Sequence, residues 1–363
     1  MKKIEYYFSI ILLLLCLAVG MSSCIKDSNV TDSSDTINLD FQLVGLSRAT
    51  DSGTDFDNMI KTLRILITDE NGTILINNLL NDVNPQNAIR ILGVPRTKVC
   101  IYAFANEESM GRKFDTQSLL EDLDSNNNGL VEANEILNRA WDANNQNDFF
   151  PLTEQEARIK NWGLPMTGYY GVQNNAYYED PGSLDLSTVA ENFKQINIKL
   201  VRCVAKVIVN IQNETNSDIG LQSIKFGRFK TNKVYYFRHT DNNGSDMPYD
   251  TGLDPYEFTC DKSLLSNSLT NSVLIYYTYP AVTPNNDDRY RFSIALTTAN
   301  YHQINGTYKE FYKTEESNKT ILERNTIMSI TGIIQENSFT VASEISAKIE
   351  DWTNKGNMEV EFN

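Results

Sequence analysis

Histidine is scarce in this sequence: only His239 and His302 occur among 363 residues, and each lies in a polar context. The sequence also lacks the G-x-S-x-G, Walker A, H-E-x-x-H and dinucleotide-binding patterns that mark common hydrolytic and nucleotide-binding sites. Paired acids such as Asp287 and Asp288 stand in charged loops, where such pairs usually face solvent. These features predict a protein that is not an enzyme.

Basic residues are outnumbered as well. The chain has 32 Lys and Arg residues against 47 Asp and Glu residues, which gives a formal net charge of -15. A surface this acidic repels the phosphate backbone of DNA and RNA. Nucleic acid is therefore not expected as a partner.

The N-terminal apolar stretch is too short for a conventional membrane-spanning helix. It runs from Phe8 to Met21, about 14 residues, whereas crossing the hydrocarbon core takes about 20. It follows the basic start Met1-Lys2-Lys3 and precedes Ser22-Ser23-Cys24, which is the order of a secretory signal. Met21-Ser22-Ser23-Cys24 resembles a lipobox, with Met where Leu is usual. We expect residues 1–23 to be a signal peptide and Cys24 to carry a covalent lipid; a retained transmembrane anchor is the alternative.

The remaining cysteines indicate little about function. If Cys16 leaves with the signal and Cys24 carries lipid, then Cys100, Cys203 and Cys260 are left, an odd number without C-x-x-C spacing. Cys100 and Cys203 lie in apolar runs, where a buried thiol is the usual state. One disulfide among the three is the open alternative.

Short alternating segments dominate the rest of the chain. In residues 36–43, Ile37, Leu39, Phe41 and Leu43 share one face and polar residues lie between them, the period of a half-buried strand. An Asn-Gly turn at Gly72 predicts a hairpin of residues 63–68 and 73–76. Further strands are expected at 99–104, 196–201, 204–209, 274–277, 292–296 and 358–362. In the last, Met358, Val360 and Phe362 alternate with acids, and the whole pattern predicts a mainly β protein built of sandwiches.

The pattern changes to helical spacing between about residues 115 and 160, with Leu119, Leu120 and Leu123 before a polar loop and Ile136 and Leu137 after it. We interpret this segment as an insertion. A second polar stretch, near residues 174–187, is the expected domain boundary because of its loop composition. The chain is long enough for two domains, which we place at 49–186 and 187–363.

The polar loop inside the insertion matches the twelve-residue EF-hand pattern D-x-[DN]-x-[DN]-G-x5-E. Gly129 stands where the pattern needs a sharp turn, and oxygen ligands at the other positions would surround a hard cation. The pattern predicts one Ca²⁺ site, and the alternative is an Asn-rich surface loop that matches by chance. Its ligands would be Asp124, Asn126, Asn128, the Leu130 carbonyl, Glu132 through water, and Glu135.

Several segments, in order along nearly the whole chain, resemble the fimbrillins, which are the subunits of type V pili in Bacteroidales. They are Leu46-Ser47-Arg48-Ala49-Thr50 after the first strand, the hairpin at 63–72, Ala105-Asn106 closing a strand, Pro165-Met166-Thr167-Gly168, Arg202-x-x-Ala205-Lys206-Val207, Glu323-Arg324-Asn325 and Asp351-Trp352.

The resemblance implies an all-β fold of two transthyretin-like, Greek-key β-sandwich domains, with the helical insertion in the first. It further implies a lipoprotein precursor that an arginine-specific protease cuts after Arg48. The cut would remove residues 24–48, the lipidated tether and first strand, including Ile37, Leu39, Phe41 and Leu43. Another subunit would then donate a strand carrying Met358, Val360 and Phe362. The partners would be other pilin subunits, that protease and the outer membrane, and the product would be a surface fimbrium.

Three alternatives stay open. Both terminal strands could be ordinary members of closed sandwiches, with Arg48 an ordinary loop residue. The chain could be the anchor subunit of a fimbrium, which keeps its lipid and its first strand. It could also be a calcium-braced surface lipoprotein that binds carbohydrate through clustered aromatic residues such as Tyr169 and Tyr170.

Overall fold

The computed structural model describes residues 35–44, 55–84, 87–142, 155–171, 182–226, 233–237, 256–282, 292–297, 321–322, 324–337 and 340–351. All structural statements below concern these residues. Residues 37–363 group as one compact unit, which contains all described helices and strands except Thr36, the first residue of the first strand. Among the described helices none is long and apolar enough to cross a membrane.

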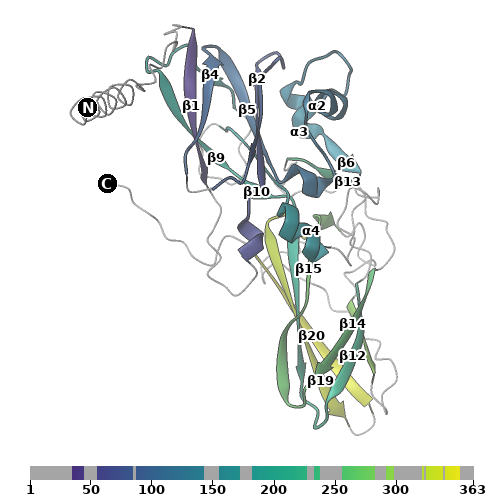
Figure 1. Ribbon diagram of the computed structural model, residues 1–363. Helices are drawn as coiled ribbons and strands as arrows, with labels where there is room; N and C mark the ends of the chain where they lie inside the picture. The colour runs from purple at the N-terminus through teal and green to yellow at the C-terminus, as the bar shows by residue number, and fades with distance from the viewer. Residues whose placement is uncertain are drawn as a thin grey trace, which may run out of the picture. The chain divides into compact units, whose positions relative to one another are not determined.

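The first half of the chain forms two facing sheets (Figure 1). The smaller sheet has the strand order β4-β1-β9, and the larger has the order β10-β7-β5-β2-β3 with β8 added to β5. Their side chains meet in one core that includes Phe41, Ile91 and Ile198 from the smaller sheet and Ile65 and Ile101 from the larger. The strands are β1 (Thr36–Val44), β2 (Thr62–Asp69), β3 (Ile74–Asn81), β4 (Ile89–Pro95), β5 (Lys98–Ala105), β7 (Met166–Tyr169), β8 (Leu184–Asp185), β9 (Phe193–Lys199) and β10 (Val201–Arg202).

The burial of each strand follows its sequence pattern. β1 alternates strictly, so that one side faces the core. β2 and β5 are instead buried along almost their whole length, and every residue from Val99 to Ala105 is buried. Such a strand needs cover on both faces. The facing sheet covers one side of β5, and aromatic side chains cover the other: Phe114 and Phe237 lie with ring centroids 4.6 Å and 5.2 Å from that of Phe104.

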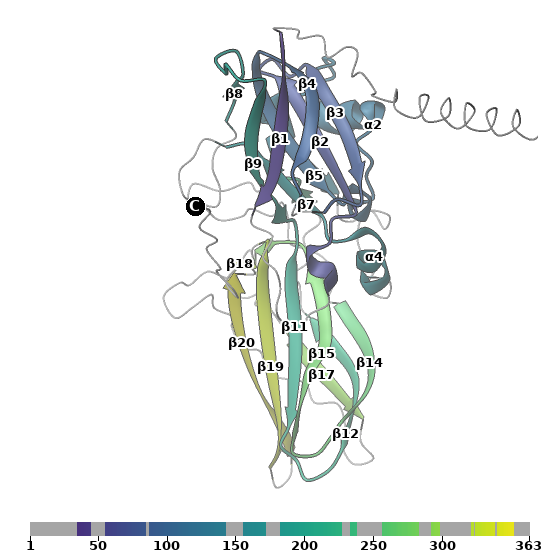
Figure 2. The same cartoon turned by 60° about the vertical axis from the view of Figure 1, so that its left-hand side comes forward.

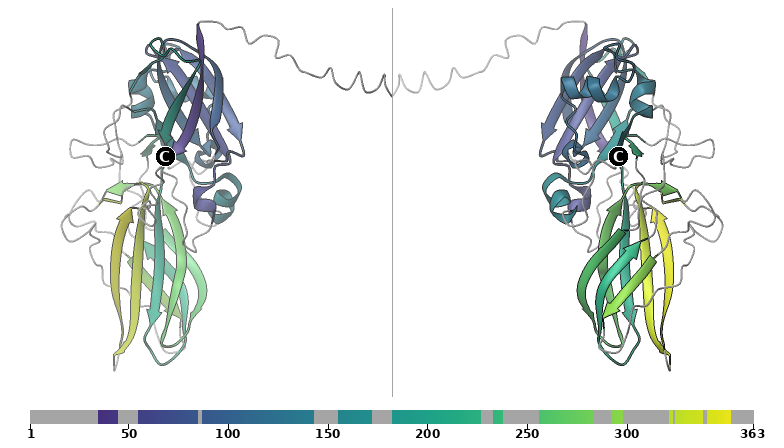
Figure 3. Two further views of the ribbon diagram at one scale, coloured as in Figure 1. Left: turned by 90° about the vertical axis from the view of Figure 1, so that its left-hand side faces the viewer. Right: turned by 90° about the vertical axis from the view of Figure 1, so that its right-hand side faces the viewer.

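The predicted helical insertion supplies part of that second cover, and Phe237 comes from a later segment of the chain. The insertion contains α2 (Thr116–Leu123) and α3 (Ala133–Asn138), preceded by the short 3-10 helix η2 (Glu107–Met110) and followed by α4 (Gln155–Trp162). Asp115 is the N-cap of α2, and its carboxylate accepts a hydrogen bond from the Ser118 N–H. Figures 1 and 3 show α2 and α3 on the side of the larger sheet that faces away from β1. Next to them, β6 (Ala140–Asp142) pairs with β13 (Lys233–Tyr235).

The second half of the chain forms another pair of sheets. One has the order β15-β11-β19-β20 and the other β14-β12-β17. The rings of Phe258 on β14 and Tyr276 on β15 pack edge to face with centroids 5.0 Å apart, so the sheets contact each other. The strands are β11 (Ala205–Asn213), β12 (Ile219–Phe226), β14 (Tyr256–Leu264), β15 (Ser268–Thr278), β17 (Phe292–Thr297), β19 (Thr326–Asn337) and β20 (Thr340–Asp351), and β16 (Ala281–Val282) pairs separately with β18 (Ile321–Leu322).

The predicted class, all-β sandwiches with a helical insertion in the first, is therefore confirmed. The domain boundaries themselves stay predictions. β9 and β10 follow the expected boundary after residue 186, yet they pair with β1 and β7, which precede it. Cys100, Cys203 and Cys260 are buried thiols that are not joined in disulfides, and burial raises the pKa of the Cys100 and Cys260 thiols.

Candidate strand-exchange site

β1 is the central strand of its three-stranded sheet. It lies between β4 and β9, as Figure 2 shows, and it runs parallel to β9 with Phe41 opposite Ile196. Its four predicted core residues are all buried: Ile37, Leu39, Phe41 and Leu43. Burying four such side chains contributes about 6–12 kcal/mol before the entropy of ordering the strand is subtracted. Removing β1 would therefore open an apolar groove flanked by two unpaired strand edges.

The outward face of β1 is held by polar contacts from β4. Arg90 binds Asp40 through two parallel bonds, Nε to Oδ1 at 2.7 Å and a terminal nitrogen to Oδ2 at 2.8 Å. The hydrogen bond from Arg90 lowers the pKa of the Asp40 carboxyl below its ordinary value of 3.8. Two residues before Asp40 in β1, the side-chain oxygen of Asn38 accepts a hydrogen bond from the Gly93 N–H at 3.2 Å. The sequence reasoning missed Arg90, although an arginine between apolar residues of a strand indicates an outward position.

The segment that follows β1 is fixed elsewhere. After residues 45–54, which lie outside the described residues, the 3-10 helix η1 (Asp55–Asn58) places the Asp57 carboxylate in a buried cluster. Lys206 Nζ lies 2.6 Å from Asp57 Oδ2, and the Tyr277 hydroxyl donates to Asp57 Oδ1 at 2.5 Å. Arg202 Nε donates to the Asp57 carbonyl at 3.1 Å. We call Asp57, Arg202, Lys206 and Tyr277 the η1 clamp.

The η1 clamp explains two of the family-like motifs in physical terms. The Arg-x-x-Ala-Lys motif supplies Arg202 and Lys206, and Arg202 also donates to Asn325 Oδ1 at 2.8 Å and to Asn58. Asn325 comes from the Glu-Arg-Asn motif. Burial lowers the pKa of Arg202 to about 10, and the nearby Asp57 opposes that shift. The partners of η1 named here, Arg202, Lys206 and Tyr277, come from β10, β11 and β15, and none of them comes from β1.

Asn106, from the Ala-Asn motif, has a similar joining role. It adopts φ 59°, a left-handed conformation that Asn tolerates better than most residues. Its side-chain oxygen accepts the Lys61 N–H at 2.8 Å, and its amide donates to the carbonyls of Met59 and Leu164 at 2.8 Å and 2.7 Å. The start of β2 is thereby fastened to the residue that precedes Pro165-Met166-Thr167-Gly168.

The loop from Asp124 to Glu135, which we call the calcium loop after the ion it is predicted to bind, is held by hydrogen bonds between its side chains and its own backbone. The Asp124 carboxylate accepts the N–H groups of Asn128 and Gly129 at 3.1 Å and 2.7 Å. Asn126 Oδ1 also accepts the Asn128 N–H, and Asn128 Oδ1 accepts the Leu130 N–H. The side-chain oxygens at the first three ligand positions therefore gather around one turn of backbone.

Glu135 closes this loop from its far end. One carboxylate oxygen accepts the Ser125 hydroxyl at 2.7 Å and the Asn126 N–H at 3.1 Å, and the other accepts the Glu132 N–H at 3.4 Å, which forms a capping box on α3. Within the described part of the chain, no group of three or more His, Cys, Asp or Glu side chains is placed to hold a metal. A cation here would depend on the two Asn amides and the Leu130 carbonyl in addition to the carboxylates.

The β2–β3 hairpin contacts the loop directly. The Val131 N–H donates to the Gly72 carbonyl at 2.8 Å. Gly72 has φ +90°, and a Cβ there would lie 2.8 Å from the Val131 carbonyl carbon, so glycine is required for this approach.

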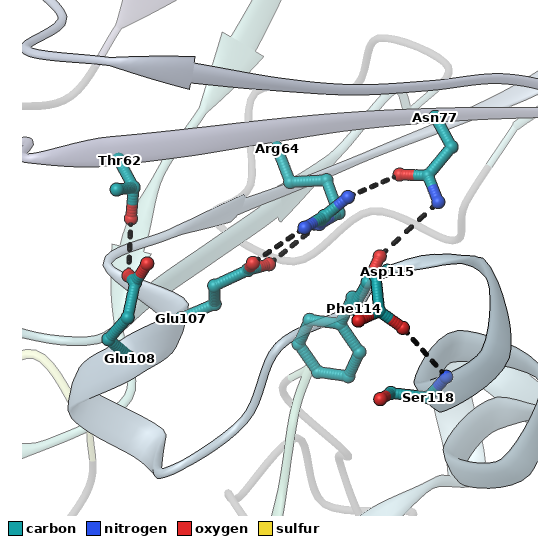
Figure 4. Close-up of polar contacts among 8 residues, drawn as sticks. All are labelled: Thr62, Arg64, Asn77, Glu107, Glu108, Phe114, Asp115 and Ser118. Atoms are coloured by element: carbon teal, nitrogen blue, oxygen red, sulfur yellow. Dashed lines mark hydrogen bonds and ion pairs between the residues drawn. The ribbon is translucent and has the colours of Figure 1, made fainter.

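A polar network holds the start of the same insertion, as Figure 4 shows. The buried Arg64 on β2 pairs with Glu107, with nitrogen to oxygen distances of 2.7 Å and 2.6 Å, and donates to Asn77 on β3. Asn77 in turn donates to the Phe114 carbonyl at 3.2 Å, directly before α2. The insertion is thus attached to the larger sheet both before α2 and at the calcium loop.

The other predicted site residues are not described. Cys24, Arg48, Met358, Val360 and Phe362 lie outside the described residues, as do His239 and His302. Of the predicted sites, the structure therefore describes only the removable strand and the calcium loop.

Comparisons with known proteins gave matches among solved structures only; no family model and no curated protein sequence matches the chain. The tip fimbrial protein of Porphyromonas gingivalis aligns with TM-score 0.46 and 14% identity over 87% of this chain and 99% of its own. A fimbrilin of the same organism aligns with TM-score 0.47 and 12% identity over 88% and 98%. Its fimbrial anchor protein aligns with TM-score 0.42 and 9% identity over 86% and 96%. Each is a protein that this chain resembles.

Proposed function

We propose that the chain is a structural or adhesive pilin subunit, exported as a lipoprotein through Cys24 and assembled with other subunits into a surface fimbrium. The role is structural rather than enzymatic. One observation carries the proposal: β1 is central in its sheet, contributes four buried side chains, and precedes a segment that contains Arg48. The sequence resemblance to fimbrillins supports it independently.

The proposed maturation step follows from what each segment contacts. A protease that cuts after Arg48 would separate the lipidated Cys24 and β1 from the rest of the chain. η1 would stay in place because the η1 clamp binds it to β10, β11 and β15. The groove between β4 and β9 would then accept an alternating strand, since main-chain pairing on both sides and apolar burial both favour it. We propose that residues 358–362 of another subunit supply that strand.

The test uses the chain without its signal and lipid, residues 25–363, and an arginine-specific protease. Mass spectrometry should show loss of residues 25–48, and size-exclusion chromatography should then show a ladder of polymers. The matched control is Arg48→Gln, which should stay intact and monomeric. Complete cutting at Arg48 without polymers would contradict strand exchange. Resistance to cutting would favour the anchor subunit, and an uncut monomer that binds glycans would favour the carbohydrate-binding alternative.

We also propose that the loop from Asp124 to Glu135 binds one Ca²⁺ ion that stiffens the insertion. The support is the twelve-residue spacing together with the inward hydrogen bonding of Asp124, Asn126 and Asn128. Calcium at ten times the dissociation constant would stabilise the folded chain by about 1.4 kcal/mol. Thermal melts should therefore shift upward with Ca²⁺ by a few degrees, and much less with Mg²⁺.

Glu135→Gln is a suitable control for that melt. Glutamine can keep the capping box on α3, whereas it removes the bidentate carboxylate that calcium needs. One amide oxygen cannot replace both carboxylate oxygens, so the variant should melt somewhat below the wild type in EDTA, and it should lose the calcium shift. Equal shifts in both proteins would contradict the proposed site.

A further inference from the structure

Residues 37–42, in β1, and residues 358–363 have matching chemistry. Residues 37–42 read Ile-Asn-Leu-Asp-Phe-Gln, and residues 358–363 read Met-Glu-Val-Glu-Phe-Asn. When the two segments are aligned, five of the six positions match in chemical type: Met358 matches Ile37, Val360 matches Leu39, Glu361 matches Asp40, Phe362 matches Phe41, and Asn363 matches Gln42. Only the second position differs in charge, with Glu359 against Asn38.

The structure shows what each matched position contacts in β1. Phe41 is fully buried and is among the largest side chains of the core, so its site requires a large apolar group. Asp40, directly before it, faces outward and binds Arg90 through both carboxylate oxygens. A strand that replaces β1 without an acid at this position would leave Arg90 without that carboxylate partner.

We propose that residues 358–363 of a second copy of this chain replace β1 in one register, with Phe362 in the site of Phe41 and Glu361 bound to Arg90. This rests on the proposed function, because the groove must first lose β1. Arg90 is then a specificity-determining residue: it selects strands that carry an acid immediately before the aromatic residue. A shift by two residues would place Glu359 at Arg90 but would put Phe362 in the site of Leu43 and Val360 in the large site of Phe41.

The test compares two charge changes on the same strand. Glu361→Lys and Glu359→Lys have the same effect on net charge, lie two residues apart, and add no arginine that the protease could cut. Each precursor is cleaved with the arginine-specific protease, cleavage is quantified by mass, and elongation is followed by light scattering. We expect Glu361→Lys to slow elongation by about threefold to tenfold and Glu359→Lys to change it by less than about twofold.

The charge swap is the decisive measurement. Adding Arg90→Glu to Glu361→Lys should restore elongation to within about twofold of the wild type, which a loss of folding would not do. Arg90→Gln serves as a second variant. In chains that carry Arg90→Gln, elongation with Glu361 and elongation with Glu361→Lys should differ much less than they do in chains with Arg90. Circular dichroism of the uncut precursors checks that each variant is folded.

Three results would overturn the inference while leaving the proposed function intact: equal effects of the two lysine variants, failure of the swap to restore elongation, or rescue of Glu359→Lys instead. Cleaved chains that stay monomeric with residues 358–363 protected from exchange would show insertion into the same copy and would also overturn it. A cleaved wild type that neither polymerises nor protects this segment would contradict the proposed function itself.

Discussion

The η1 clamp should be a large contributor to stability, and Asp57→Ala measures it. Asp57 and Lys206 have side chains only 3% and 4% exposed, so their charges are shielded little by water. Removing the carboxylate takes away the negative charge that lies 2.6 Å from the buried Lys206 ammonium and that favours the charged form of the buried Arg202 guanidinium. It also removes the acceptor of the Tyr277 hydroxyl.

The magnitude follows from the cost of breaking a buried ion pair from one side, which is about 3–5 kcal/mol. An exposed pair would cost about 0–1 kcal/mol, so the two cases are easy to separate. The assay is urea unfolding of the lipid-free precursor with the slope of the transition compared between variants. An unchanged slope indicates that the midpoint shift reports stability.

A double variant tests the reasoning itself. Asp57→Ala combined with Lys206→Met has no lysine charge left to neutralise, and it should be more stable than the sum of the single changes predicts. A single change that costs less than about 1 kcal/mol, or a double variant whose loss equals the sum, would refute the buried-charge argument.

Two further changes test contacts described above. Gly72→Ala should destabilise the precursor by about 1–3 kcal/mol in urea unfolding, because the added Cβ would clash with the calcium loop. Gly93→Ala is the control: it also has a positive φ, +71°, but no atom lies within 4 Å of the added Cβ, so it should cost less. Equal losses of stability in the two variants would contradict the contact at Gly72. Asp40→Asn should lower the melting temperature near neutral pH, because the pKa of Asp40 is lowered in the folded chain and the stability from Arg90 is complete above the unfolded pKa. That difference should shrink as the pH falls below 3.8 and through the lowered pKa, and a difference that persists in acid would show that Arg90 is not its cause.

Strict alternation of apolar and polar residues predicted strands that have one buried face and one solvent-facing side. Residues 36–43 alternate, and the strand and its buried face were both predicted correctly. The hairpin of β19 and β20 was missed, because Thr326–Asn337 mixes apolar and polar residues without strict alternation and contains Gly332. Strands of this kind are specified by the neighbours they pair with, which one sequence does not display.

The η1 clamp was beyond such reasoning for a different cause. Asp57 lies in a polar, acidic stretch that reads as a solvated loop, and its partner Lys206 is 149 residues away. The partners of Asp57 are easier to recognise in the sequence. Arg202 and Lys206 are two cations in an otherwise apolar run, which indicates that they are buried and paired with other groups. The loop from Asp124 to Glu135, by contrast, could be singled out from sequence because its candidate ligands lie within twelve consecutive residues, and its binding of Ca²⁺ stays a prediction.

The central position of β1 has a mechanical consequence for the proposed fimbrium. A strand held on both sides, by β4 and by β9, is loaded in shear when it is pulled along its own axis, so all of its main-chain hydrogen bonds resist together. An edge strand pulled sideways would instead lose its bonds one after another. Under this assembly each joint between subunits would resist tension like the interior of a single sheet, and the fibre would bear the drag of flowing liquid without a covalent link.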